Sequence, residues 1–158
     1  MKKTALRWFV FMIVSSSLLL AACGSSPAAG DGPDSLEITD TTGHTVTLDG
    51  LPQEIAIAGK ASVMVQDAAF MFDEADRRVK ALENRNQSVF DFLPVVDPTI
   101  DEKDLFERDA GPEQIAAVKP DLVLMKNFNK SKLGDAVEKL GMPVLYLNLD
   151  TPEILYQA

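Results

Sequence analysis

Short apolar runs alternate with helix-like segments between residues 55 and 149, and few folds accommodate that alternation. Four segments have the length and composition of strands: residues 55–58, 79–82, 122–125 and 144–149. Parallel strands need long crossover connections, which are usually helices that pack on the faces of the sheet. The sequence therefore predicts an α/β fold, a parallel sheet with helices on both faces.

The segments around these runs carry signals for helices. Ser62 can cap a helix over residues 62–72, and Pro112 starts a second helix with an acid in its first turn. A third helix, over residues 131–140, is amphipathic, because four apolar residues are spaced i, i+3, i+4 and i+7: Leu133, Ala136, Val137 and Leu140. Thr151 is the predicted N-cap of a further helix.

A β-hairpin is predicted ahead of the sheet. Residues 36–39 and 45–48 alternate apolar and polar side chains, and the segment between them is rich in turn-forming residues. We expect His44, the only histidine, to lie at the surface of this hairpin. Residues 84–98, which contain two prolines, are predicted to be an irregular loop with four apolar anchors: Val89, Phe90, Phe92 and Leu93.

The first 22 residues have the features of an export signal. Basic residues precede an apolar stretch over residues 8–20, which is shorter than the roughly 20 residues of a comfortable membrane span. Leu-Ala-Ala-Cys, ending at Cys23, resembles the lipobox of bacterial lipoproteins, in which the cysteine is acylated and becomes the first mature residue. We predict a signal peptide over residues 1–22, lipidation of Cys23, and a flexible tether over residues 23–35.

The charge balance argues against one class of partner. The chain has 24 acidic and 15 basic residues, a formal net charge of −9. Because an acidic surface repels phosphate backbones, we expect no nucleic acid partner. The single cysteine also excludes an intramolecular disulfide.

Four blocks, in order, resemble the first part of class III periplasmic binding proteins, the receptors for iron siderophores and vitamin B12 that serve ABC importers. The blocks are ITDTTGHTVTL at residues 38–48, IAI at 55–57 after Pro52, GPEQIAAVKPDLVL at 111–124, and KLGMPV at 139–144. In that family, two Rossmann-like lobes joined by one long helix close over the ligand. The resemblance implies that residues 36–150 are the first lobe, that residues 151–158 begin the interlobe helix, and that the second lobe is absent from these 158 residues.

The implied function is that of a substrate-binding lipoprotein of an ABC importer. It would capture an iron chelate or a corrinoid and pass this small molecule to a membrane permease, while lipid on Cys23 anchors it to the cell membrane, facing the periplasm or the cell exterior. The resemblance implies no enzymatic activity and no cofactor. Related receptors for zinc or manganese use several histidines, so a single histidine argues against a metal site.

Loops that follow strands are the candidate ligand-binding segments, because ligands of open α/β sheets bind beyond the carboxyl ends of the strands. Lys60, Arg85 and Lys126 would place cations around an anionic chelate. Phe90 and Phe128 could stack on a planar ligand, although solvated lysines and core aromatic residues account for the same pattern. The candidate ligand-binding residues are Gly59, Lys60, Ala61, Ser62, Asn84, Arg85, Asn86, Gln87, Lys126, Asn127 and Phe128.

Two other classes of function remain open. An enzyme is disfavoured, because the sequence lacks a G-x-G-x-x-G motif after residue 57, a P-loop and a G-x-S-x-G nucleophile motif. A surface lipoprotein that acts through protein contacts, or a truncated or inactive receptor fragment, is compatible with the missing second lobe.

Overall fold

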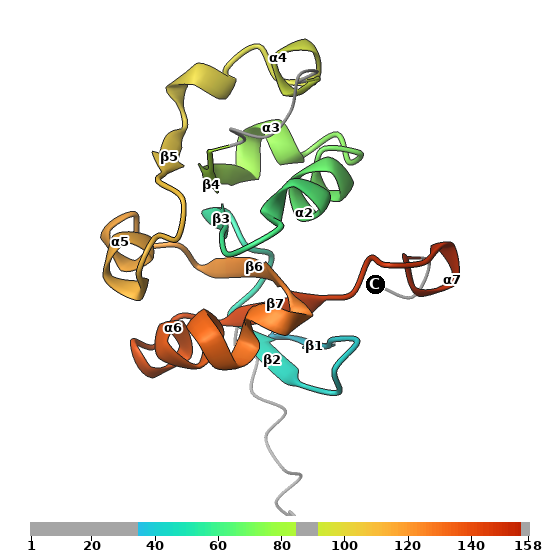
Figure 1. Ribbon diagram of the computed structural model, residues 1–158, viewed down its shortest axis with the longest axis vertical. Helices are drawn as coiled ribbons and strands as arrows, with labels where there is room; N and C mark the ends of the chain where they lie inside the picture. The colour runs from blue at the N-terminus through green and yellow to red at the C-terminus, as the bar shows by residue number, and fades with distance from the viewer. Residues whose placement is uncertain (1–34, 85–91, 156–158) are drawn as a thin grey trace, which may run out of the picture. The chain divides into compact units, whose positions relative to one another are not determined.

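Figure 1 shows the computed structural model of the chain, which describes residues 35–84 and 92–155. The predicted signal peptide and Cys23 lie outside these residues. So do the candidate ligand-binding residues Arg85, Asn86 and Gln87, and the anchors Val89 and Phe90.

The centre of the fold is a five-stranded sheet in which every neighbouring pair of strands is parallel. Its strands are β3 (Ile55–Ile57), β4 (Val79–Glu83), β5 (Asp104–Phe106), β6 (Leu122–Lys126) and β7 (Val144–Leu147), in the spatial order β5-β4-β3-β6-β7. The predicted parallel sheet is therefore confirmed. The sequence gives no sign of the edge strand β5, because only one of its three side chains, that of Phe106, is buried.

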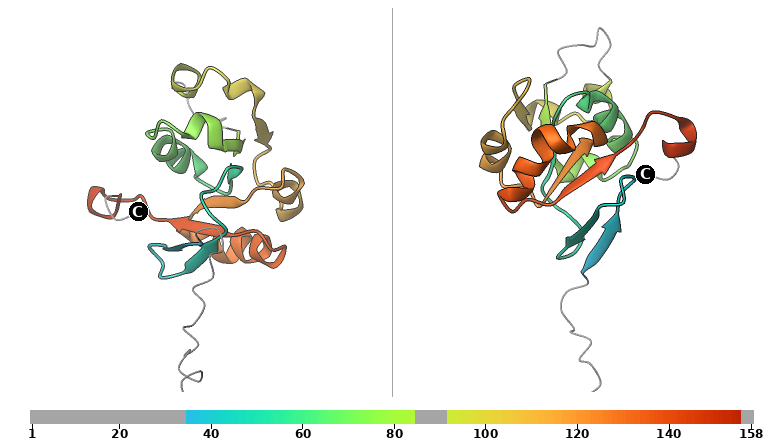
Figure 2. Two further views of the ribbon diagram at one scale, coloured as in Figure 1. Left: turned by 180° about the vertical axis from the view of Figure 1, so that it is seen from behind. Right: turned by 60° about the horizontal axis from the view of Figure 1, so that its bottom comes forward.

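Helices cover both faces of this sheet, as predicted (Figures 1 and 2). The α-helices are α2 (Ser62–Ala69), α3 (Ala75–Arg78), α4 (Leu93–Val96), α5 (Pro112–Ala117), α6 (Asp135–Lys139) and α7 (Pro152–Leu155). Because side chains alternate along a strand, Ile57 belongs to one apolar cluster, with Val65 of α2. Ala56 belongs to the cluster on the other face, with Ile115 of α5 and Val137 of α6.

The predicted hairpin is formed by β1 (Leu36–Thr39) and β2 (Thr45–Leu48), which pair antiparallel. Val46 and Leu48 point inward and share an apolar cluster with Leu122 and Leu145 of the main sheet. The hairpin therefore packs on the sheet through one face, while the other face remains exposed, as the alternation in the sequence predicts.

His44 is partly exposed on the hairpin, and its ring also makes specific contacts. Its side chain is 31% exposed, and its ring meets that of Tyr146 edge-on, with 5.6 Å between the centroids. The Asp40 carboxylate lies 3.6 Å from Nδ1, and the Glu138 carboxylate lies 3.5 Å from Nε2. Two acidic groups and an aromatic ring thus hold the imidazole in place.

Helix α2 starts and ends differently from the prediction. Ser62 is its first helical residue rather than its cap, and Ala61 occupies the N-cap position with φ 59° and no side-chain capping bond. The helix ends at Ala69, so the exposed side chains of Met71 and Phe72 lie beyond it.

The predicted helix over residues 131–140 is divided. A π-helical turn, η3 (Lys130–Gly134), precedes α6, which ends at Lys139. Leu140 therefore lies past the helix and is 52% exposed, contrary to the spacing argument. Thr151 does cap α7, because its hydroxyl oxygen accepts a hydrogen bond from the backbone N–H of Ile154 at 3.4 Å.

The predicted irregular loop contains a short helix, α4, in its described part. Leu93 is 1% exposed, which confirms it as an apolar anchor, whereas the side chain of Phe92 is 37% exposed. The next turn, η1 (Ile100–Glu102), leads into β5.

Candidate ligand-binding edge

The carboxyl ends of β3 and β6 lie side by side at the centre of the sheet. The chain leaves β3 toward β4 on one side and leaves β6 toward β7 on the other, so the direction of winding reverses between them. Such a switch point is where ligands bind in open α/β sheets. Two of the three predicted loops, residues 59–62 and 126–128, follow these strands and meet there.

Asn129 joins the two loops. Its Oδ1 accepts a hydrogen bond from the backbone N–H of Lys60 at 3.0 Å, and its Nδ2 donates to the backbone carbonyl of Lys60 at 3.0 Å. Nδ2 also donates to the carbonyl of Lys126 at 3.2 Å. Because Asn129 is only 2% exposed, it forms a buried clasp between segments 69 positions apart.

Gly59 makes this clasp possible. Its φ of +91° is one that L residues rarely adopt, and a Cβ there would lie 2.9 Å from Cγ of Asn129. Any larger residue would therefore push the asparagine out of its position.

Lys60 and Ala61 are exposed beyond the clasp. The Lys60 ammonium lies 3.5 Å from the Asp109 carboxylate, and both side chains are more than half exposed. An exposed ion pair of this kind contributes about 0–1 kcal/mol, so Lys60 remains available to an anionic ligand. Ser62 differs, because it is buried and its hydroxyl accepts a hydrogen bond from Nε2 of Gln66 at 3.4 Å.

Glu83, at the end of β4, is a buried acid that the sequence did not single out. Burial raises the pKa of its carboxyl group, and the negative charge of Asp109 raises it further, although hydrogen bonds from the backbones of Asp109 and Gly59 oppose the shift. The next residue, Asn84, continues the strand ladder, since its N–H donates to the Phe106 carbonyl at 3.0 Å. Its half-buried side chain lies at the same edge.

Lys126, the last residue of β6, is 2% exposed. Its ammonium forms an ion pair with Asp150, in the connection between β7 and α7, and lies 3.7 Å from the Met64 sulfur. Lys126 therefore does not present a free cation in the way the sequence suggests, because Asp150 compensates its charge.

Asn127 and Phe128 form the short turn η2 (Asn127–Asn129) next to this pair. Oδ1 of Asn127 accepts the Phe128 N–H at 2.9 Å, which fixes the turn locally. The Phe128 side chain is 45% exposed, and the Lys132 ammonium lies 6.0 Å from its ring centroid. An exposed ring at this edge is available for stacking.

Several residues of this edge escaped the sequence reasoning: Gln66, Glu83, Asp109, Asn129 and Asp150. Glu83 and Asn129 directly adjoin candidate loops, so extending each loop by one residue would have included them. Asp150 follows β7, whose end was not among the candidate loops. Gln66 carries no such signal. It lies within α2, is fully buried, and donates to the Glu83 carbonyl at 2.7 Å.

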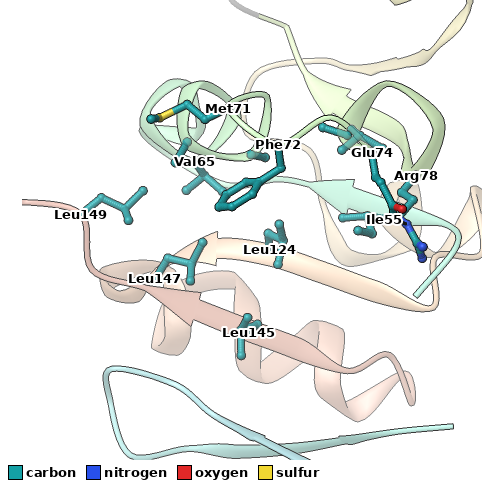
Figure 3. A pocket seen from close by; sticks show the side chains of 14 residues that line it. Ile55, Val65, Met71, Phe72, Glu74, Arg78, Leu124, Leu145, Leu147 and Leu149 are labelled. Atoms are coloured by element: carbon teal, nitrogen blue, oxygen red, sulfur yellow. Dashed lines mark hydrogen bonds and ion pairs between the residues drawn. The ribbon is translucent and has the colours of Figure 1, made fainter. Parts of the chain in front are cut away.

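A separate apolar pocket of about 500 Å³ lies on the α2 side of the sheet (Figure 3). Leu124, Leu145, Leu147 and Leu149 line one wall and Phe72 points toward them. It contains none of the predicted ligand-binding residues. Within residues 35–84 and 92–155, no helix is long and apolar enough to cross a membrane, and no three His, Cys, Asp or Glu side chains gather as metal ligands.

No protein-family model matches the chain, and no curated protein matches it. Solved structures do match. A periplasmic solute-binding protein from Veillonella parvula is 19% identical with a TM-score of 0.62, over 77% of this chain and 38% of that one. The molybdate-binding protein MolA of Haemophilus influenzae is 17% identical with a TM-score of 0.59, over 75% and 36%. The catecholate-siderophore binding protein VctP of Vibrio cholerae is 22% identical with a TM-score of 0.53, over 72% and 37%.

The chain thus matches less than two fifths of the length of each of these binding proteins. At these identities the likeness establishes the fold. The described residues, a parallel α/β sheet with a preceding hairpin, share the fold of the matched part of these periplasmic binding proteins.

Proposed function

We propose that this lobe binds a small ligand at the carboxyl edge of β3 and β6, as part of a substrate-binding protein of an ABC importer. The Asn129 clasp is the observation that carries the proposal. Asn129 fixes the loop of Lys60 against the loop of Phe128 at the switch point of the sheet. The side chains of Lys60 and Phe128 remain exposed. Rigid loops with an exposed cation and an exposed ring suit the binding of a preformed ligand.

An iron chelate or a corrinoid is the ligand class that these groups favour. Lys60 can pair with carboxylate or catecholate oxygens, and Phe128 can stack on a planar group. Among the structurally similar proteins, one is named as a receptor for catecholate siderophores and another is described with molybdate bound, and both ligands carry negative charge on oxygen.

The remaining parts of the proposal follow from the same model of function. The protein would be exported, anchored through lipid on Cys23, and would hand its ligand to a membrane permease without catalysing a reaction. A ligand held between two lobes gains contacts from both, so the lobe described here would supply one part of the binding energy.

Calorimetric titration of the purified protein with a ferric catecholate, a ferric hydroxamate, cobalamin and molybdate tests this function. We expect one of them to bind, and we expect Lys60→Gln and Phe128→Ala each to weaken binding. Lys119→Gln is the matched control, because Lys119 precedes β6 and therefore lies toward the opposite edge of the sheet. Equal weakening by the control, or no effect of the two edge substitutions, would contradict the proposed site.

A further inference from the structure

Lys126 and Asp150 form an ion pair at the ligand-binding edge, and their side chains differ in exposure to solvent. The Lys126 side chain is 3% exposed and is fixed at the end of β6, whereas that of Asp150 is 59% exposed and belongs to the connection between β7 and α7. The cation is thus buried by the fold, while the anion reaches it from a position open to solvent.

A buried ammonium requires a negative partner, because an unpaired charge in the interior is costly. The other described neighbours do not supply one. Met64 offers a thioether sulfur at 3.7 Å, which is a weak and uncharged acceptor. Asn129 uses its Nδ2 to donate to the Lys126 backbone carbonyl and so contributes no negative charge. In this part of the chain Asp150 is the carboxylate paired with Lys126.

The position of Asp150 can be taken by another anion without opening the core. More than half of its side chain is in contact with solvent, so a carboxylate or oxyanion can approach the Lys126 ammonium from the same side. The exchange replaces one charge-assisted pair by another of the same type. It would also release the connection that leads from Leu147 to Pro152, the first residue of α7.

We propose that Lys126 is an anion-binding residue that exchanges Asp150 for a carboxylate or oxyanion group of the ligand. This inference rests on the proposed function and specifies its ligand chemistry. The ligand must carry an accessible negative oxygen, from either an organic carboxylate or an inorganic oxyanion. Without a ligand, the Asp150 carboxylate pairs with the Lys126 ammonium, and it therefore competes with the ligand for this cation.

Removing the competitor should strengthen binding. If Asp150 occupies Lys126 about nine tenths of the time, Asp150→Asn should lower the Kd for a suitable anion about tenfold, because the apparent affinity scales with the fraction of free sites. Lys126→Met should abolish binding of the same anion. Citrate and molybdate, titrated separately by calorimetry, distinguish the carboxylate from the inorganic oxyanion. Asp49→Asn removes the same charge from an exposed position after β2 and should leave the Kd unchanged.

A direct readout makes the test independent of how well each variant folds. The ¹⁵N signal of the Lys126 ammonium in the unsubstituted protein, assigned by its loss in Lys126→Met, should shift when the anion is added. Ligand binding that neither Asp150→Asn nor Lys126→Met alters would overturn the exchange and leave the proposed function intact. An anion-dependent shift of Lys126 without binding of any chelate would support the exchange and contradict the chelate-binding function. An equal gain in Asp49→Asn would show a general charge effect and overturn the inference.

Discussion

Asp40, in the hairpin turn, accepts a hydrogen bond from the backbone N–H of Tyr146 at 3.1 Å, although 106 positions separate the two residues. Tyr146 belongs to β7, which pairs with β6 and is an edge strand of the five-stranded sheet. The other carboxylate oxygen of Asp40 accepts the N–H groups of Thr42 and His44 at 2.8 and 3.0 Å. One carboxylate thus closes the hairpin turn and also satisfies a donor on the sheet edge.

Asp40→Asn should therefore destabilise the lobe in a pH-dependent way. Burial acts to raise the pKa of Asp40, but the hydrogen bonds from Thr42, His44 and Tyr146 outweigh it and hold the pKa below its usual range. The carboxylate contributes stability above its unfolded pKa, and this contribution is lost as the pH falls through the folded pKa.

The substitution should lower the free energy of unfolding by about 1–2 kcal/mol at neutral pH, as expected when hydrogen bonds to a charged group are lost. Urea unfolding at pH 7 and at about pH 2 measures the effect, and the difference between Asp40→Asn and the unsubstituted protein should shrink at the lower pH. A difference of the same size at both pH values would show that the charge on Asp40 is unimportant. Asp49→Asn, at an exposed position, serves as the control.

Gly59→Ala should destabilise the lobe by about 2–4 kcal/mol, because it combines an unfavourable backbone conformation with an overlap in the core. The overlap is with Asn129, whose Cγ would lie 2.9 Å from the new methyl group. Gly43→Ala separates the two causes, since Gly43 also has a positive φ but has no atom within 4 Å of the added Cβ. Denaturant unfolding should show a smaller loss for Gly43→Ala, about 1 kcal/mol. Equal losses would mean that the Asn129 contact is not tight.

The parts of this fold that could be predicted from the sequence are those with a local pattern. The apolar runs mark β3, β6 and β7, because these strands are mostly buried and therefore apolar over successive residues. The pattern of β4 is weaker, because the exposed Lys80 interrupts it. Strand β5 has only one buried side chain and leaves no such run. Leu140 fits the helical spacing but lies past the end of α6, where spacing no longer determines burial.

The candidate site could be predicted in position but not in its contacts. The rule that ligands bind beyond strand ends identified the loops of Lys60 and Phe128. The Asn129 clasp depends on which strands become neighbours, and the sequence alone left that order open. Pairing of Lys126 with Asp150 has the same origin, because it requires β6 and β7 to lie side by side in parallel register.

Glu83→Gln should stabilise the lobe at neutral pH. Because burial and the charge of Asp109 raise the pKa of Glu83, the folded state binds a proton more tightly than the unfolded state, and stability falls as the pH rises from the unfolded pKa through the folded pKa. Glutamine cannot ionise, so the variant should gain stability relative to the unsubstituted protein at pH 7 and show little difference near about pH 4. Thermal unfolding over this pH range measures the difference in stability between the variant and the unsubstituted protein. Glu37→Gln, at an exposed position in β1, should show no such trend.

Cys23→Ala should abolish membrane retention if Cys23 is lipidated, because acylation requires the thiol. Acyl chains on one residue stabilise membrane binding by about 0.8 kcal/mol for each buried methylene group, which is enough for a stable anchor with two or more chains. Cell fractionation followed by carbonate extraction measures the anchor. A substituted protein that still sediments with membranes and resists extraction would contradict the lipoprotein prediction.

Asn129→Ala should loosen the ligand-binding edge before it unfolds the lobe. The substitution removes two hydrogen bonds to Lys60 and one to Lys126, so the amide proton of Lys60 should exchange with solvent faster. Asn127→Ala is the matched control, because it removes only a local bond and should affect the Phe128 amide instead. Hydrogen exchange followed by NMR distinguishes the two amides.

The same substitution tests whether the clasp matters for binding. If a ligand contacts Lys60 and Phe128 together, its binding to the Asn129→Ala variant must also order the two loosened loops. That ordering costs free energy, so the Kd of the variant should be about tenfold higher, which corresponds to roughly 1.4 kcal/mol. Faster exchange of the Lys60 amide with an unchanged Kd would mean that the ligand contacts only one of the two loops. The clasp would then be a structural feature of the lobe, and the proposed site would have to be confined to the side of β3 or of β6 whose single substitution still weakens binding.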